Sequence, residues 1–372
     1  MLVLGIESSC DETAGAIVEE GCRVLSNVVA SQEALHRKFG GVVPELASRA
    51  HVERLVPVLD ETVRRAGVSL SQVDAVAVTN SPGLIGALLT GLTAAKTLAL
   101  VLGRPLVAVN HVYAHCYAIH LVDDERGESE QCKATRQLAA SPSPDAQTRA
   151  PEQRPTASYP LISLIVSGGH TAIFLCRSVT DVELLGSTTD DAAGEAFDKV
   201  AKILGLGYPG GPAIERAARG GSRSAVRFPR SFGDADDLDF SFSGIKTAVL
   251  YHCRGQDARS TEPLGLSPER IADIAASFQE AVVEVLVTKT FRAAELCRLR
   301  QVVVGGGVAC NNRLREAFLE RAAGRFEVLF PAKKYCTDNA AMVAGLGYHL
   351  LKTGAPAPLD VDAIPQLLRS TA

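Results

Sequence analysis

Two histidines, His111 and His115, are four residues apart directly after an apolar segment at residues 105–110. At 3.6 residues per turn, this spacing places both imidazoles on one face of a helix, about 40° apart, where they can chelate one metal ion. A packed histidine beside an exposed one, without metal, is the alternative that the spacing leaves open. No glutamate lies between them, so the segment lacks the general base of the H-E-x-x-H metalloprotease helix. His120 would lie on a different face of the same helix, so it is not expected to bind the metal together with this pair.

A third metal ligand has to come from another segment of the chain. Asp338, in the polar loop at residues 337–339, is the best candidate. Two histidines and one carboxylate with open coordination positions suit zinc or ferrous iron. If the pair binds metal, a single divalent ion, Fe²⁺ or Zn²⁺, held by His111, His115 and Asp338 is the site that these residues suit.

Three polar or glycine-rich turns follow predicted strands and suit the binding of an anion. They are residues 7–13 (ESSCDET), 167–171 (SGGHT) and 305–311 (GGGVACN). Paired glycines accept positive φ and let backbone N–H groups approach a phosphate, and a helix that follows adds partial positive charge. None of the turns fits the P-loop pattern or opens a Rossmann unit. Each alone would suit an ordinary turn, but together they indicate a phosphate or nucleotide site.

Strands and helices that alternate along the chain must position these residues. Apolar runs predict strands at residues 2–6, 16–18, 74–79, 105–109, 161–166, 172–175 and 301–304. Helical periodicity and cap residues predict helices at residues 44–66, 86–102, 191–204, 268–297 and 312–323. This alternation predicts an α/β layer architecture. Both halves open with a strand, a polar turn and a second strand, which is weak internal symmetry.

Residues 123–158 differ in composition from the rest. They are rich in Pro, Ser, Ala and Gln and poor in large apolar side chains. Such a segment cannot bury enough surface to offset its ordering entropy, so we predict a disordered insertion at a lobe boundary.

The overall composition is that of an ordinary globular protein. Among 372 residues, 47% are hydrophobic and 22% charged, and no apolar run crosses a bilayer without interruption. The start of the chain resembles neither a signal peptide nor a transit peptide, which favours a cytoplasmic protein without membrane contact. Nine scattered cysteines without a C-x-x-C pair argue against a disulfide framework. Cys10, Cys310 and Cys336 lie in glycine- or acid-rich loops, where reactivity is an alternative to a packing role.

The net charge of −4 gives no sign of a self-sufficient nucleic-acid binder, which usually carries a basic excess. The local basic runs are Arg64-Arg65, Arg223 with Arg227 and Arg230, and Lys333-Lys334. Each suits a solvated surface. Binding to RNA would therefore depend on local charge or on a partner protein.

Seven motifs, in order, resemble those of the TsaD family of tRNA threonylcarbamoyltransferases. They are residues 5–13 (GIESSCDET), 110–115 (NHVYAH), 166–171 (VSGGHT), 191–199 (DAAGEAFDK), 208–212 (YPGGP), 240–247 (FSFSGIKT) and 336–339 (CTDN). The resemblance spans nearly the whole chain outside residues 123–158. It implies a two-lobed fold of the actin, sugar kinase and Hsp70 type, with an active-site cleft between duplicated α/β lobes. Residues 1–122 with about 345–372 would form the first lobe, and residues 159–344 the second.

The resemblance also assigns roles to individual residues. His111, His115 and Asp338 would hold the metal. The residues that would line the site for an adenine nucleotide or threonylcarbamoyl-AMP are Val166, Ser167, Gly168, Gly169, His170, Asp198, Gly211, Glu215 and Asn311. Asn311 would face the adenine or the ribose. No residue stands out as a general base, and Asp11 and Glu12 are the nearby possibilities.

The implied reaction is transfer of a threonylcarbamoyl group from threonylcarbamoyl-AMP to the N6 amine of the adenosine next to the tRNA anticodon, position 37, with release of AMP. The substrates would be tRNAs that read codons beginning with adenine. The implied partners are a degenerate paralogue (TsaB-like) and a small ATPase (TsaE-like). Three alternatives remain: a small-molecule kinase of the same fold, which would not need the histidine pair; a metalloprotease, which lacks its base; and a non-catalytic scaffold, which would tolerate the loss of Asp338.

Overall fold

The first of two sheets is built around the buried apolar run at the start of the chain. The computed structural model describes residues 1–124, 157–234, 237–255, 265–354 and 356–366. The first sheet has the strand order β5-β4-β1-β2-β3-β6. Its strands are β1 (Leu2–Glu7), β2 (Glu12–Glu19), β3 (Arg23–Ser31), β4 (Ala75–Ser81), β5 (Leu106–Asn110) and β6 (Val122–Asp123). Strands β1, β2 and β3 form an antiparallel meander, and β4 and β5 continue the sheet parallel to β1.

The second sheet repeats this arrangement. Its order is β11-β10-β7-β8-β9, with an antiparallel meander from β7 to β9 and with β10 and β11 parallel to β7. The strands are β7 (Leu161–Val166), β8 (Thr171–Cys176), β9 (Val182–Ser187), β10 (Gln301–Gly305) and β11 (Glu327–Leu329). Five strands in each sheet thus share one topology, which confirms the predicted duplicated α/β fold. The turn at residues 7–13 and the turn at residues 167–171 occupy equivalent places, after the first strand of each meander.

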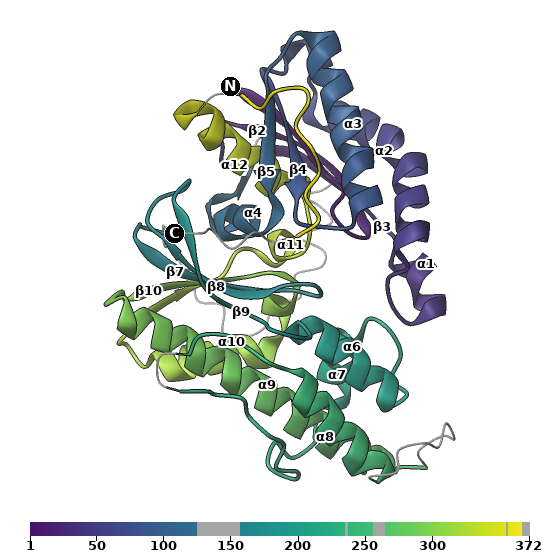
Figure 1. The fold of residues 1–372 in the computed structure, drawn as a ribbon, viewed down its shortest axis with the longest axis vertical. Coiled ribbons are helices and arrows are strands. Elements are labelled where there is room, and N and C mark those ends of the chain that lie inside the picture. Colours follow the sequence, from purple (N-terminus) through teal and green to yellow (C-terminus); the bar gives the residue numbers. More distant parts are fainter. Residues whose placement is uncertain (125–156, 235–236, 256–264, 355, 367–372) are drawn as a thin grey trace, which may run out of the picture.

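Helices cover both faces of the first sheet (Figure 1). On one face lie α2 (Pro44–Ala66) and α3 (Ile85–Leu102), and on the other lies α12 (Ala340–Thr353). α2 has the predicted bounds because Pro44 suits the first helical turn and Gly67, at φ 66°, ends the helix in the left-handed conformation. Burial on both faces explains why β1 and β4 are almost continuously apolar.

The helix α3 is the one described helix with the length and hydropathy of a membrane span. Its apolar character serves the first lobe, because it packs on β4 and on α2. A Cβ atom added at Gly91 would lie 2.3 Å from the Ser8 hydroxyl oxygen, so this helix also packs closely on the turn that follows β1.

The second sheet is covered on one face by the long helix α9 (Pro268–Leu296), which lies along β7 and β10 (Figure 1). Around α9 are α6 (Ala193–Ile203), α7 (Gly210–Ala217), α8 (Ser243–Arg254) and α10 (Asn312–Ala322). Ser267 begins α9 as predicted, because its side chain accepts a hydrogen bond from the Arg270 N–H and Pro268 takes the first helical position.

The short helix α4 (His111–Tyr117) lies between the two lobes (Figure 1). Its Ala114 and Tyr117 pack in the same apolar cluster as α12. Its Val112 and Cys116 pack on the second sheet, among apolar residues of β7, β8 and β10. α4 therefore belongs to the core of both lobes, and its remaining face carries the two histidines.

After the second lobe, α12 and the segment at residues 356–366 pack on the first lobe again. α12 packs on β1, β2, β4 and β5 from Ala340 onwards. The segment at residues 356–366 then follows the sheet: the Ala357 N–H donates to the Leu106 carbonyl at 2.8 Å, and the Ile364 N–H donates to the Asn80 carbonyl at 2.8 Å. Of the predicted insertion at residues 123–158, positions 125–156 lie outside the described residues, so its disorder stays a prediction.

Candidate metal centre and cleft

Asn110 starts the helix that presents both histidines. Its side-chain oxygen accepts hydrogen bonds from the N–H groups of Val112 and Tyr113, at 2.9 and 3.1 Å. This cap satisfies two of the free donors at the helix start and sets where α4 begins. His111 is then the first residue of the helix and His115 lies one turn later, as the spacing predicts.

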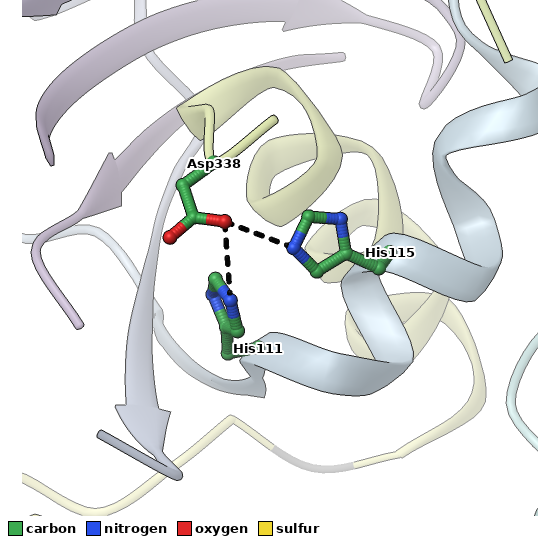
Figure 2. A group of neighbouring side chains, drawn as sticks. All are labelled: His111, His115 and Asp338. Atoms are coloured by element: carbon green, nitrogen blue, oxygen red, sulfur yellow. Dashed lines mark hydrogen bonds and ion pairs between the residues drawn. The ribbon is translucent and has the colours of Figure 1, made fainter. Parts of the chain in front are cut away.

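The two imidazoles converge on Asp338, in the loop between α11 (Lys333–Cys336) and α12 (Figure 2). The Asp338 Oδ1 atom is 3.1 Å from His115 Nε2 and 3.5 Å from His111 Nε2. The three ligand atoms all lie within 4.8 Å of one another. Residues separated by more than two hundred positions therefore form the predicted triad.

Glu7, the last residue of β1, holds His111 in place and was not assigned a role from the sequence. Its Oε2 atom is 2.9 Å from His111 Nδ1 and accepts a hydrogen bond from the Thr79 hydroxyl at 2.5 Å, while Oε1 accepts from the Ser9 N–H at 2.6 Å. A carboxylate on one ring nitrogen leaves the other nitrogen free to bind a metal. A fully buried carboxylate needs such partners, and the burial of Glu7 is known only from the structure.

The charges around the triad favour a cation at its centre. Burial by itself lowers the pKa of His111, but the carboxylates of Glu7 and Asp338 outweigh it and raise that pKa well above its ordinary value. Burial opposes ionisation of Asp338, yet His111 and His115 hold its pKa well below the usual range. Burial lowers the pKa of His115.

The donor set fits a divalent metal. Both Nε2 atoms face one carboxylate oxygen, Glu7 orients one of the rings, and the site already concentrates negative charge. His115 Nδ1 is buried and has no hydrogen-bond partner within the described part of the chain. Two imidazoles and a carboxylate are ligands for Zn²⁺ or Fe²⁺, and this set does not decide between them.

We expect His111→Ala, His115→Ala and Asp338→Ala each to lower metal affinity by about 100-fold or more with the fold retained, and Glu7→Gln to lower it by about tenfold. Elemental analysis and competition with a chelator measure this, and circular dichroism checks the fold. His120→Ala and His349→Ala are matched controls, because these histidines contact the hydroxyls of Tyr159 and Tyr117 instead. Full metal occupancy in the His111/His115 double variant would place the metal elsewhere.

The turn at residues 167–170 lies next to the triad. The His111 and His170 ring centroids are 6.0 Å apart. Burial and the neighbouring His111 lower the pKa of His170 to about 4. The turn is closed by the Ser167 N–H, which donates to the His170 carbonyl at 2.7 Å, and by the His170 N–H, which donates to the Ser167 hydroxyl at 3.1 Å.

Gly168 and Gly169 do not have the backbone conformation that we predicted for them. Neither has a positive φ, so the expectation that this turn needs glycine for φ is wrong. A Cβ atom at either position would meet nothing within 4 Å. Hydrogen bonds of Ser167 and His170 close the turn, so the glycines are not needed for its conformation. Their contribution is that they leave the backbone at the surface of the turn uncovered.

Gly306, in the third turn, is the glycine that the fold requires. Its backbone has φ 89° and ψ 162°, a region that is essentially restricted to glycine. A Cβ atom there would lie 2.3 Å from the carbonyl oxygen of Val166, at the end of β7. The third turn therefore packs directly against the start of the second.

We expect Gly306→Ala to lower the free energy of unfolding by about 2 kcal/mol or more, because it adds a clash to the backbone strain. Gly324→Ala is the control for strain alone, since Gly324 has φ 73° but open space around it, and about 1 kcal/mol is expected. Gly169→Ala should change the value by less than about 0.5 kcal/mol. Urea unfolding measures the free energy of unfolding of all three variants. Equal losses for Gly306→Ala and Gly324→Ala would show that Val166 moves away from the added methyl group at little cost.

Three further predicted residues, Asp198, Gly211 and Glu215, lie together on the second lobe. Asp198 on α6 accepts a hydrogen bond from the Gly210 N–H at 2.6 Å, and burial raises its pKa to about 6. Gly211, the next residue of α7, has open space where a side chain would be. Glu215 on α7 accepts from the Asn312 N–H at 3.1 Å and from its side-chain amide at 2.7 Å. These contacts join α6, α7 and α10.

Asn311 has a structural role that was not predicted. Its side-chain oxygen caps α10 by accepting from the Leu314 N–H at 3.0 Å, and its amide donates to Gln279 at 2.8 Å. The side chain is therefore already occupied within the protein. Its contact with an adenine or ribose stays a prediction.

Asp11 and Glu12 differ in their surroundings. Glu12 is the first residue of β2, not part of the turn as expected, and its carboxylate accepts from the Ser31 hydroxyl at 3.2 Å. Burial, Asp338 and Asp11 together raise the pKa of Glu12 well above its ordinary value. The charge of Asp11, on the first lobe, acts on Tyr208 of the second lobe, whose pKa is raised by burial and by Asp11 and Asp198.

Fold and site together define a class: a two-lobed protein of the actin, sugar kinase and Hsp70 fold, with a histidine and carboxylate triad between its lobes. Among solved structures, full-length HypF in its phosphate- and nucleotide-bound form shares this fold, with a TM-score of 0.54 at 14% identity over 98% of this chain and 47% of HypF. The family profile described as TsaD, tRNA N6-adenosine threonylcarbamoyltransferase, matches residues 23–129 and 145–345. The chain belongs to this family.

Two relatives show how close the match is. The tRNA N6-adenosine threonylcarbamoyltransferase of Syntrophobacter fumaroxidans is 52% identical over 366 residues, 98% of each chain. The protein of the same name from Symbiobacterium thermophilum is 49% identical over 367 residues, 98% of this chain and 96% of the relative. The profile leaves residues 130–144 unmatched, a shorter stretch than the predicted insertion.

Proposed function

We propose that this protein transfers a threonylcarbamoyl group to the N6 amine of adenosine in tRNA. The target is the adenosine next to the anticodon, in tRNAs that read codons beginning with adenine. The donor is threonylcarbamoyl-AMP, and AMP is released. Besides family membership, the observation that carries the proposal is the position of the triad beside the turn at residues 167–170, with His111 and His170 at a ring distance of 6.0 Å.

The reaction requires attack by a weak amine on the carbonyl of a mixed anhydride, and AMP leaves through its phosphate group. The uncovered backbone N–H groups at Gly168 and Gly169 could donate hydrogen bonds to that phosphate, and threonylcarbamoyl-AMP would then lie beside His170. A divalent metal held by His111, His115 and Asp338 would stabilise negative charge on the carbonyl or the phosphate. The binding site for the nucleotide would extend over Asp198, Gly211 and Glu215, which lie together on α6 and α7.

The attacking amine loses a proton, and Asp11 and Glu12 are the residues that we propose to accept it. Both lie on the first lobe, between the end of β1 and the start of β2, and the charges of both act on Cys10 and Tyr208. The raised pKa of Glu12 brings it closer to the range in which a carboxylate works as a general base.

Gly169→Val is expected to weaken the binding of ATP or AMP by about tenfold. The valine side chain would project into the open space over the turn and obstruct the approach of a phosphate to the backbone. Gly41→Val is the matched control, because Gly41 also has open space around it and no positive φ, but no proposed role. Isothermal titration calorimetry measures the affinities, and equal values for the wild type and Gly169→Val would remove this turn from the site.

We propose that tRNA modification requires a degenerate paralogue and a small ATPase, in the cytoplasm. Two features support a requirement for protein partners. The net charge of −4 is poor for unaided tRNA binding. In addition, α2 and α3 pack against each other and carry large exposed apolar side chains: Val52, Val56, Ile85, Leu89, Leu100 and Val101.

The proposed function is tested with purified protein, its partners, labelled threonylcarbamoyl-AMP and tRNA. We expect one AMP to be released for each modified adenosine, as measured by nucleoside mass spectrometry. A kinase would instead consume ATP to phosphorylate a hydroxyl, without tRNA. Label found on a small molecule or on protein, with none on tRNA, would overturn the proposal.

A further inference from the structure

His51, on α2, is a fully buried polar side chain to which the proposed reaction gives no role. Its ring makes two hydrogen bonds to the chain between β1 and β2. The Nε2 atom is 2.9 Å from the carbonyl oxygen of Cys10, and the Nδ1 atom is 2.8 Å from the hydroxyl oxygen of Thr13, which is also fully buried. The two contacts lie on either side of Asp11 and Glu12 in the sequence. A helix side chain therefore spans the two acids that we propose as proton acceptors.

The two partners determine which ring nitrogen of His51 carries the proton. A carbonyl oxygen can only accept, so Nε2 is protonated and donates to Cys10. Burial is the largest influence on the pKa of His51 and lowers it, which keeps the ring neutral. In a neutral ring Nδ1 is then an acceptor, and the Thr13 hydroxyl donates to it. A single tautomer thus satisfies both contacts.

The carbonyl groups before and after that of Cys10 are bound to other segments of the first lobe. The Ser9 carbonyl accepts from the Leu84 N–H at 2.8 Å. The Asp11 carbonyl accepts from the Gln32 N–H at 3.0 Å. Both of these donors are backbone groups, which are present whatever the side chains are. The carbonyl between them is held by a side chain, so its position depends on the identity of residue 51.

We propose that His51 is a positioning residue of the transfer reaction, which holds the carboxylates of Asp11 and Glu12 where they accept the proton of the attacking amine. The assignment rests on the proposed function, in which these two acids are the candidate bases. The Cys10 carbonyl belongs to the peptide group that precedes Asp11, and Thr13 directly follows Glu12. Fixing both therefore fixes the backbone from which the two carboxylates project. A displacement of about 1 Å in such a group can cost about 100-fold in rate.

Three substitutions of His51 separate its two contacts. His51→Leu removes both at similar size. The amide of His51→Gln keeps a donor at the position of Nε2, whereas the shorter amide of His51→Asn keeps only an acceptor at the position of Nδ1. We expect kcat to fall by about 100-fold in the Leu and Asn variants and by less than about fivefold in the Gln variant. KM for threonylcarbamoyl-AMP and for tRNA should stay within about twofold of the wild type, because the loss concerns the transition state.

The measurement is steady-state transfer to tRNA by the full chain with its proposed partners. Thr62→Val is the matched control, since this fully buried hydroxyl lies about three turns further along α2 and donates to the Val58 carbonyl at 2.7 Å. Its kcat should stay within about twofold of the wild type. Circular dichroism and titration with Zn²⁺ should show that each variant is folded and keeps its metal affinity.

A wild-type kcat in His51→Leu would overturn the proposal, and so would equal losses in the Gln and Asn variants or a change in KM alone. If His51→Leu does not fold, the comparison of His51→Gln with His51→Asn decides. Nitrogen-15 NMR of the histidine rings tests the hydrogen bonds independently of activity, with the signal of His51 assigned from its loss in His51→Gln. We expect the proton on Nε2, and a proton on Nδ1 would overturn the positioning role. A wild-type chain with the expected tautomer that does not modify tRNA would instead overturn the proposed function.

Discussion

Asp338→Ala is expected to lower the rate of threonylcarbamoyl transfer by about 100-fold or more, while tRNA affinity changes by less than about twofold. Asp338 is the carboxylate on which His111 Nε2 and His115 Nε2 converge, so its loss removes both a ligand and the negative charge that favours a cation there. Stabilisation that acts in the transition state raises the rate, whereas tRNA binding depends mainly on phosphate contacts elsewhere. A 100-fold loss corresponds to about 2.7 kcal/mol, within what one electrostatic contact supplies in enzymes.

Single-turnover transfer and filter binding of tRNA measure the two quantities on the same preparations. Asp338→Asn keeps an oxygen ligand without the charge and should fall between the wild type and Asp338→Ala. Asp181→Ala is a control on an exposed hairpin of the second lobe, where the side chain is 59% exposed. If Asp338→Ala loses its metal but keeps the wild-type rate, the metal is structural and our account of the chemistry is wrong.

The purified chain alone should modify tRNA at least about 100-fold more slowly than the same chain with the proposed partners, a degenerate paralogue and a small ATPase. A chain with a net charge of −4 is poorly equipped to bind a polyanion without help, although the proposed site for the donor is on this chain. The reconstituted rate at low tRNA concentration should fall steeply between 50 and roughly 200 mM salt, because cations are displaced from tRNA phosphates on binding.

The measurement is modified adenosine per tRNA against partner and salt concentration. Potassium glutamate and potassium chloride at equal concentration control for effects of a particular anion. Full activity of the isolated chain would mean that the tRNA-binding surface is complete without a partner.

The sequence predicted the strands that are covered on both faces of the sheet. Strands β1, β4, β7 and β10 are buried on both sides and read as continuous apolar runs. Two of the strands that it missed, β3 and β9, have weaker patterns for a physical reason. β3 and β9 lie toward the outer side of each meander, and partly exposed residues interrupt their apolar positions.

The site shows a similar division. The histidine pair could be predicted because α4 is a local structure with a known period, and Asp338 because it is an acid in a polar loop. Glu7 could not be assigned, because its role depends on β1 and β4 lying side by side, which brings Thr79 to its carboxylate. The same holds for Asn311, whose role as a helix cap is also stabilised by Gln279 on α9.

We propose that this chain makes threonylcarbamoyladenosine in tRNA at the triad of His111, His115 and Asp338 and the turn beside it. The most direct measurement is the amount of this nucleoside in tRNA hydrolysates from cells depleted of the chain and complemented with the wild type or with Asp338→Ala. We predict that the nucleoside disappears on depletion, returns with the wild type and stays at about one hundredth of that level, or below, with the variant at matched expression. Threonylcarbamoyladenosine at its full level in depleted cells would contradict the proposed function, and full restoration by Asp338→Ala would contradict the role of the triad.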